Sequence, residues 1–175
     1  MSRKILNYLY FQIGWTACIL GVAHHRPWIA PMSTAILIAI HFLFFSDQPG
    51  KESLFMAATS LIGCAMDLFF IHIGVYSFPP AAAPMSAPIL FSLWLLFSST
   101  INSSLSWLKG RYILAALLGF IGSPLSYLSG SRLGAIIFQS PIWPRLIILG
   151  VAWAVAVPLM TFGAVKFMPE TRASQ

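Results

Sequence analysis

Six long apolar stretches alternate along the chain with short segments that are polar or rich in proline. A membrane-spanning helix needs about 20 mostly apolar residues, so each stretch is long enough to predict one span. We therefore predict an all-α, polytopic transmembrane helix bundle that forms a single integral-membrane domain over residues 1–175. The predicted spans are residues 5–23, 28–45, 53–76, 89–108, 112–138 and 145–167. No internal repeat is evident in the pattern.

The fifth predicted span is unusually long and contains Pro124. A proline inside a helix removes one backbone hydrogen bond and bends the helix, which here leaves the carbonyl of Phe120 available to another partner. We expect a single span kinked at Pro124. The alternative is a span followed by a re-entrant segment, which membranes tolerate only inside a protein interior.

The composition supports a membrane location. Hydrophobic residues make up 58% of the chain and charged residues 8%, whereas a soluble domain carries about 25% charged residues. The net charge of +6 does not indicate a nucleic-acid partner, because the basic residues are scattered singly or in pairs at the span ends. Such residues are typical of topology signals.

Lysine and arginine also predict the orientation, because they accumulate on the cytoplasmic side of a membrane protein. With six spans, one side carries seven basic residues: Arg3, Lys4, Lys51, Lys109, Arg111, Lys166 and Arg172. The other side carries two, Arg26 and Arg145. Both termini are therefore predicted to be cytoplasmic, and the first apolar stretch is predicted to be a retained span.

Asp67 is the most informative polar residue, because it lies inside the third predicted span. The other acidic residues, Asp47, Glu52 and Glu170, lie at the edges of apolar stretches, where we expect water to reach them. A carboxylate near the middle of a membrane helix costs at least about 2.5–3.5 kcal/mol. We therefore consider Asp67 a candidate proton carrier, catalytic acid or substrate ligand. The alternatives are a structural ion pair with Arg132 or a protonated, hydrogen-bonded carboxyl group.

The remaining polar residues inside the spans fall at two depths. Asp67, His72 and Arg132 form a possible outer layer, in which Asp67 and His72 are the catalytic candidates and Arg132 is a candidate binding residue. The possible inner layer contains Asn7, Gln12, His41 and Asn102, of which the two asparagines and the glutamine are candidate binding residues.

Small residues on a membrane helix usually mark the face that packs against a neighbouring helix. In the third span, Asp67 shares such a face with Ser60, Gly63 and Cys64 and is therefore predicted to point into the bundle. The fifth span carries a similar stripe, made of Gly122, Ser126, Gly130 and Gly134. Arg132 points away from that stripe, toward either Asp67 or lipid phosphate.

No metal site or cofactor is predicted. Neither Cys18 nor Cys64 has the spacing of a metal or disulfide motif. The adjacent His24 and His25 point in different directions on a helix and would make a poor metal site.

Three segments carry a resemblance to a known family. They are Asn7-x3-Phe11-Gln12-x2-Trp15; Leu93-Trp94-x2-Phe97-x4-Asn102-x-Ser104-Leu105-x-Trp107-Leu108; and Gly122-x-Pro124-Leu125-x-Tyr127-Leu128-x-Gly130-x-Arg132-Leu133-Gly134-Ala135. Together they resemble domain-of-unknown-function family 2878, a group of uncharacterised bacterial inner-membrane proteins. Ser123 departs from that pattern, which more often has glycine before the proline.

The resemblance implies a small multi-pass protein of the bacterial cytoplasmic (inner) membrane with no established activity, and an association with membrane-lipid or fatty-acyl modification. Three functions stay open. The first is an accessory or structural protein whose partners are membrane lipids and another membrane protein. The second is an intramembrane lipid-modifying enzyme that uses Asp67, with Arg132 holding a phosphate or carboxylate. The third is a small proton or solute carrier.

Overall fold

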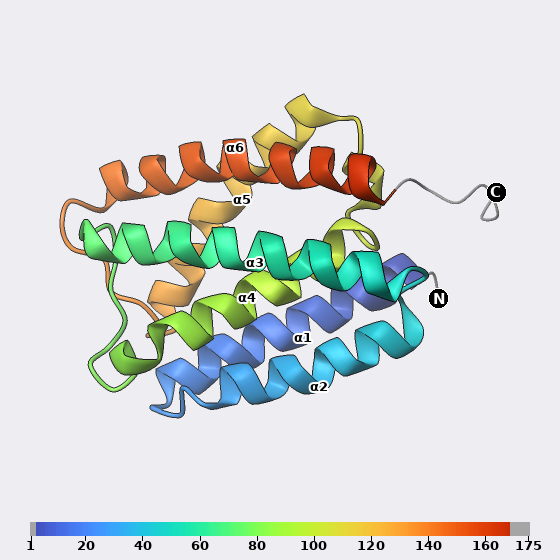
Figure 1. Cartoon of the computed structure of the whole chain (residues 1–175). Helices are drawn as coiled ribbons and strands as arrows, with labels where there is room; N and C mark the ends of the chain where they lie inside the picture. Colours follow the sequence, from blue (N-terminus) through green and yellow to red (C-terminus); the bar gives the residue numbers. More distant parts are fainter. Residues whose placement is uncertain (1–2, 169–175) are drawn as a thin grey trace.

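The computed structural model describes residues 3–168, and these form a helical bundle without strands (Figure 1). The six α-helices are α1 (Arg3–Ala23), α2 (Ile29–Phe44), α3 (Pro49–His72), α4 (Ser86–Ile101), α5 (Tyr112–Arg132) and α6 (Ile142–Phe167). Two short 3-10 helices, η1 (Ala83–Met85) and η2 (Ser106–Leu108), lie at the two ends of α4. The prediction of an all-α fold is confirmed.

Five helical segments are long and apolar enough to cross a membrane: α1, α3, α4 together with η1, α5 and α6. The remaining helix, α2, has 16 residues, which corresponds to about 24 Å and is shorter than the hydrocarbon core of a typical bilayer. Large apolar side chains such as Leu43 and Ile113 are 76% and 82% exposed. These features indicate a membrane protein; the count of six spans and the orientation stay predictions.

Consecutive helices pack in pairs, α1 with α2, α3 with α4, and α5 with α6. The first two hairpins join through α4, which contacts both α1 and α2, while α3 also contacts α6. Figure 1 shows α5 behind the other helices and inclined to them. The described chain ends lie at the same end of the bundle as the α2–α3 and α4–α5 connections (Figure 1).

The first helix of each hairpin ends in the same way. The residue two positions after the helix has a left-handed backbone, at φ 59° for His25, 73° for Gly74 and 85° for Gly134. In each case the next amide donates to the carbonyl five residues before it, at 2.7, 2.9 and 2.9 Å. This is the Schellman motif, which satisfies carbonyls left free at a helix end.

Aligning these three turns reveals an internal repeat. The pattern of apolar stretches in the sequence did not show this repeat. Gly74 and Gly134 differ by 60 in number, as do Ser77 and Ile137. Those last two residues pair in an isolated antiparallel bridge, with N–H···O distances of 2.9 and 2.8 Å. His25 and Gly74 differ by 49. The second and third hairpins are therefore related by an offset of 60, and the first hairpin shares the turn that ends their first helices.

Several helix boundaries differ from the predictions. The fifth helix ends at Arg132 instead of residue 138, because the left-handed Gly134 terminates it. It continues through Pro124 as one helix. The third helix covers Pro49–His72 rather than residues 53–76, and the fourth ends at Ile101 rather than at residue 108.

The packing face predicted for α5 is only partly correct. Gly130 is buried, but Gly122 and Ser126 are exposed, and a Cβ added at Gly122 would meet no atom within 4 Å. Close contact with α6 occurs instead at Gly119, where a Cβ would lie 2.3 Å from the Trp153 carbonyl oxygen. The Phe120 carbonyl, freed by Pro124, lies against Gly150 of α6.

Candidate functional site

Asp67 lies on the inward face of α3 and is 2% exposed. Ser60, Gly63 and Cys64 are buried on the same helix, as their spacing predicts. The glycine has a specific role, because a Cβ at Gly63 would lie 2.0 Å from the Trp94 ring. The absence of a side chain therefore lets the indole of α4 approach α3 closely enough to reach Asp67.

Three neutral donors surround the Asp67 carboxylate. Trp94 donates its indole N–H to Oδ2 at 2.6 Å, and Tyr76 donates its hydroxyl to Oδ1 at 3.0 Å. Tyr127 also donates to Oδ1, through a short hydrogen bond. These donors come from α4, from the α3–α4 loop and from α5. Within residues 3–168, no basic side chain forms an ion pair with Asp67.

The hydrogen bonds account for the burial of Asp67 without a counter-ion. A hydrogen bond to a charged group contributes about 1.5–3 kcal/mol, so three of them offset the roughly 2.5–3.5 kcal/mol that a carboxylate costs inside a membrane helix. A phenol both donates and accepts. Tyr76 and Tyr127 could therefore also accept a hydrogen bond from a protonated Asp67.

Aromatic packing holds these donors in place. The rings of Trp94 and Trp153 stack with centroids 4.5 Å apart and an interplanar angle of 13°. Tyr76 and Tyr127 meet edge to face at 5.3 Å. The indole N–H of Trp153 faces the Tyr127 hydroxyl without a hydrogen bond of good geometry. We call Asp67, Tyr76, Trp94, Tyr127 and Trp153 the Asp67 hub.

The hub lies on the internal repeat. Asp67 and Tyr127 differ by 60 in number, and Trp94 and Trp153 by 59. In the first hairpin the position equivalent to Asp67 is Cys18, whose sulfur lies 3.8 Å from the Thr34 hydroxyl of α2. In the first two hairpins, the same position of the first helix thus contacts a side chain of the second helix.

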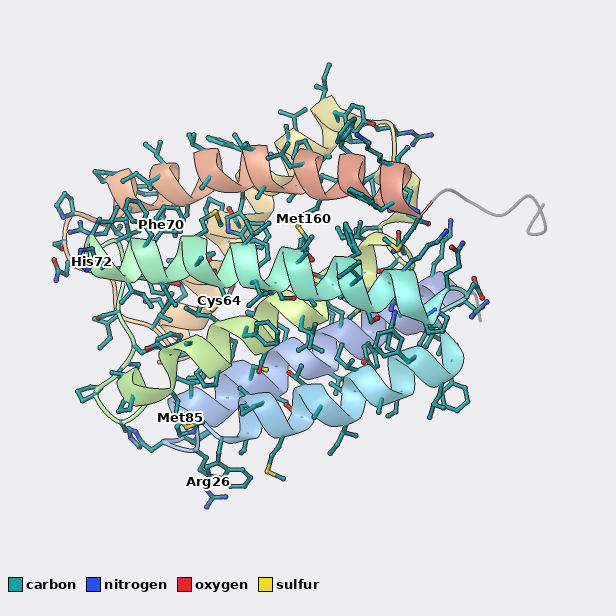
Figure 2. The ribbon with its side chains drawn as sticks, viewed as in Figure 1. Arg26, Cys64, Phe70, His72, Met85 and Met160 are labelled. Carbon is teal, nitrogen blue, oxygen red and sulfur yellow. The ribbon has the colours of Figure 1, made fainter. Side chains whose placement is uncertain are left out.

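His72 and Arg132 are not brought to Asp67. Both are exposed, and both lie in the last turn of their helices. Their residue numbers differ by 60, so they occupy equivalent positions of the repeat. The Asp67–Arg132 ion pair, one of the alternatives considered for these residues, does not form. A cation at a helix C-terminus interacts favourably with the helix dipole. Figure 2 shows His72 at the same end of the bundle as Arg26.

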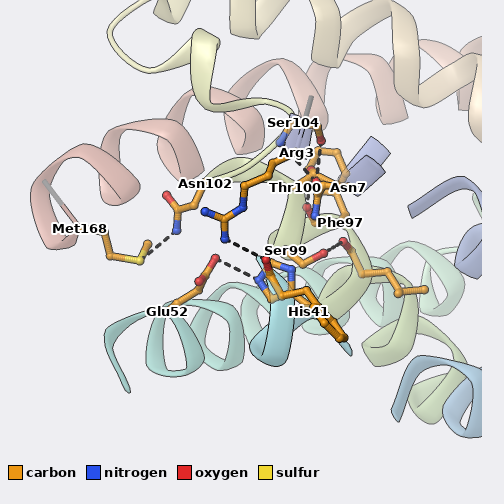
Figure 3. A network of polar contacts seen from close by, with 12 residues as sticks. Arg3, Asn7, His41, Glu52, Phe97, Ser99, Thr100, Asn102, Ser104 and Met168 are labelled. Atoms are coloured by element: carbon orange, nitrogen blue, oxygen red, sulfur yellow. Dashed lines mark hydrogen bonds and ion pairs between the residues drawn. The ribbon is translucent and has the colours of Figure 1, made fainter. Parts of the chain in front are cut away.

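A second buried carboxylate was missed in the sequence. Glu52, which we expected to be reached by water, is 4% exposed, and its Oε1 lies 3.2 Å from Nε2 of His41 (Figure 3). The His41 ring stacks on Phe45 at 6.0 Å. The charge of Asp47 is exposed as expected, and Glu170 lies outside the described residues.

Two of the candidate binding residues lie in this region. Asn7 is fully buried and accepts hydrogen bonds at Oδ1 from the Ser104 hydroxyl at 2.8 Å and the Ser104 amide at 3.3 Å. Asn102 donates to the Met168 sulfur at 2.9 Å. Figure 3 shows both asparagines near His41 and Glu52. Gln12 does not join them, because it is exposed and donates to the Tyr8 hydroxyl at 3.1 Å.

The sequence carried only partial signals for these two sites. Trp94 lies in the middle of an apolar stretch, where an interfacial tryptophan is not expected, and this position could have suggested a buried donor. Within residues 3–168, no three His, Cys, Asp or Glu side chains group in a way that could hold a metal ion. Cys18 and Cys64 are buried free thiols.

One comparison with known proteins gives a match. The model of a family described as "Protein of unknown function (DUF2878)" matches residues 4–159. Neither the curated proteins nor the solved structures provide a significant match. The matched range includes every residue of the Asp67 hub and the His41–Glu52 pair.

Proposed function

We propose, since the chain belongs to the DUF2878 family of proteins of unknown function, that it is an accessory or structural component of the bacterial inner membrane. In this proposal it supports a lipid- or fatty-acyl-modifying partner and does not itself catalyse the reaction. The lipid connection comes from the family resemblance. The structural role comes from the geometry of Asp67.

The observation that carries the proposal is that both oxygens of the Asp67 carboxylate accept hydrogen bonds from other parts of the bundle. Its two oxygens accept three hydrogen bonds from α4, α5 and the α3–α4 loop. A catalytic carboxylate must present an oxygen to its substrate, whereas both oxygens here connect parts of the bundle. His72 and Arg132, the residues that could assist a reaction, are exposed and away from Asp67.

The outer face of α5 supports a partner in the membrane. Gly122 and Ser126 are exposed on this helix, and the space beside Gly122 is open. Small residues let two membrane helices approach closely. We propose that a helix of the partner protein packs on this face, while membrane lipids cover the remaining apolar surface.

The proposal can be tested in host cells that lack the chromosomal copy, by comparing the acyl composition of their lipids with the amount of folded protein. Asp67→Asn and Trp94→Phe both weaken the hub and should lower the amount of folded protein. We expect the acyl composition of the lipids to change in proportion to that loss of folded protein. An Asp67→Asn protein that is fully folded but inactive would refute the structural role of Asp67.

A matched pair of glycine variants tests the partner surface. Gly122→Leu places a side chain in open space, so we expect it to fold normally but to lose the lipid phenotype. Gly119→Leu collides with the Trp153 carbonyl and should reduce the folded amount itself. If Gly122→Leu restores the wild-type lipid profile in full, the partner surface is not on this face.

A second candidate function is proton or solute transport, and the internal repeat favours it. In transporters built from repeats, the ion and substrate sites lie where the repeats meet. The Asp67–Tyr127 hydrogen bond joins equivalent positions of two hairpins. Proton flux into liposomes that contain the purified protein tests this function: a carrier requires a flux that Asp67→Asn abolishes.

A further inference from the structure

Polar atoms that are buried without a hydrogen-bond partner concentrate at one end of the bundle. Within residues 3–168, the side chains that carry such atoms are Asn7, Tyr10, His41, Ser46, Glu52 and Asn102, together with Ser60 and Trp153 elsewhere. We call the first six the Glu52 cluster. Its members come from α1, α2, the α2–α3 turn, α3 and the end of α4.

The contacts within the cluster centre on Glu52. Its carboxylate faces His41 at 3.2 Å, and the side chains of Ser46 and Asn102 lie close to it. The Tyr10 ring lies 6.5 Å from the His41 ring. Figure 3 shows Glu52 pointing toward His41, with Asn102 and Asn7 in the same polar region.

Beyond the Glu52–His41 contact, the cluster holds buried atoms that still need a hydrogen-bond partner: Asn7 Nδ2, Tyr10 Oη, His41 Nδ1 and Asn102 Oδ1. Each buried donor or acceptor without a partner costs about 1–3 kcal/mol, and a typical domain has only about 5–15 kcal/mol of net stability. Buried polar sites of this kind hold ordered water that makes two to four hydrogen bonds. Ordered water between the side chains of the Glu52 cluster would supply these partners.

The chemistry of the cluster favours protons over other ligands. Imidazole, amide and hydroxyl groups can both donate and accept, and the carboxylate accepts. Arg3 lies on the same end of the bundle, where it donates to the Phe44 carbonyl at 2.8 Å and pairs with the exposed Asp47 at 3.3 Å. A proton taken up by the Glu52–His41 pair leaves that pair neutral overall, whereas within residues 3–168 no three His, Cys, Asp or Glu side chains group to hold a metal ion.

We propose that the Glu52 cluster is a hydrated proton-binding site, in which Glu52 and His41 share one exchangeable proton. Water delivers the proton from the end of the bundle that carries Arg3 and Asp47. The proton bonds to Oε1 of Glu52 or to Nε2 of His41, and it returns to water when it leaves. The other titratable neighbour is Tyr10 of α1, whereas Asn7 and Asn102 are uncharged. This site is separate from the Asp67 hub and does not depend on the proposed accessory function.

Infrared difference spectroscopy of the full chain in lipid nanodiscs can test this proposal. The chain contains two glutamates, Glu52 and Glu170, so the Glu170→Gln variant labelled with ¹³C-carboxyl glutamate reports Glu52 alone. We expect a pH-dependent protonated-carboxyl band that moves with the isotope and shifts promptly in D₂O. His41→Gln should change the midpoint of this band, while the exposed His72→Gln should not.

Three results would overturn the proposal. The first is a labelled band whose intensity does not change with pH. The second is a band whose midpoint is the same in His41→Gln, and the third is a band that does not shift in D₂O. Metal binding by the purified protein that disappears in His41→Gln would assign the cluster to a cation instead. If His41→Gln does not fold, the pH dependence and D₂O exchange of the labelled Glu170→Gln protein still decide, because that protein keeps the cluster intact.

Discussion

Two buried carboxylates on α3 have different surroundings. Asp67 accepts hydrogen bonds from one indole and two phenols, so its oxygens are occupied by groups that rarely change charge. Glu52 faces His41, the side-chain type that most readily changes charge near neutral pH. At the scale of single residues, Asp67 is therefore suited to hold the structure together and Glu52 to exchange a proton.

Asp67→Asn should destabilise the protein strongly. The amide nitrogen of asparagine must replace one carboxylate oxygen. Because the Trp94 indole can only donate, that nitrogen should face the two tyrosine hydroxyls, which lose their charged acceptor. We expect a loss of about 3 kcal/mol in the free energy of unfolding, because hydrogen bonds to a charged group are lost and a buried donor is left unpaired. Unfolding of the purified protein in mixed micelles measures this loss.

Asp47→Asn is the control for this prediction. Asp47 is exposed, so this variant should lose much less stability than Asp67→Asn. Equal stability of Asp67→Asn and the wild-type protein would show that the hub does not hold the hairpins together.

The residue patterns predicted which side of a helix is buried better than they predicted which groups form hydrogen bonds with the buried side chains. The small-residue face of α3 correctly indicated that Asp67 points inward. Its partners were not predictable, because Tyr76 reaches it from a loop and Tyr127 from a helix 60 positions away. Glu52 was missed because it lies in the first turn of α3, where an acidic residue usually faces water near the helix N-terminus.

The elements themselves were predictable from the apolar stretches, but their ends were not. Hydropathy continues past Arg132, so the fifth span was extended to residue 138, whereas the backbone turns at the left-handed Gly134. The packing side of α5 was also misassigned. Both Gly119 and Gly122 are small, and only the crossing with α6 decides which of them is covered.

The two glycines of α5 therefore make a sharp element-scale prediction. Gly119→Ala should destabilise the protein by about 1–3 kcal/mol, as overpacking does in a close-packed core, because its Cβ would lie 2.3 Å from a backbone oxygen of α6. Gly122→Ala should be neutral or slightly stabilising, since alanine favours the helix. Thermal unfolding of the two variants measures the difference, and equal melting temperatures would contradict the α5–α6 contact.

The three helix ends give a second prediction for the elements. Gly74→Ala and Gly134→Ala should each cost about 1 kcal/mol, because a Cβ is disfavoured in the left-handed region. His25 occupies the equivalent position at φ 59°, so His25→Gly should have the opposite sign and stabilise the protein. Chemical unfolding of the three variants tests the equivalence, and destabilisation by His25→Gly would contradict it.

At the scale of the whole molecule, the repeat makes Asp67 an exception among equivalent positions. Cys18 and Tyr127 occupy the corresponding places in the other hairpins, and neither carries a charge at neutral pH. The only carboxylate of the three lies between the second and third hairpins, with Tyr127 as one of its donors. A change at Asp67 thus affects how two hairpins pack against each other as well as the local hydrogen bonds.

The orientation of this bundle in the membrane is the last prediction. Basic residues concentrate at the end that carries the chain termini, so we expect that end to be cytoplasmic. The native Cys18 and Cys64 are buried, which keeps background labelling low. Single cysteines at Gln139 and Gly50, exposed positions in the α5–α6 loop and the first turn of α3, can therefore be labelled separately in intact cells. A membrane-impermeant maleimide should label Gln139→Cys and spare Gly50→Cys until the membrane is opened. The reverse pattern would invert the topology, and labelling of both in intact cells would mean that the two ends do not lie on opposite sides of the membrane.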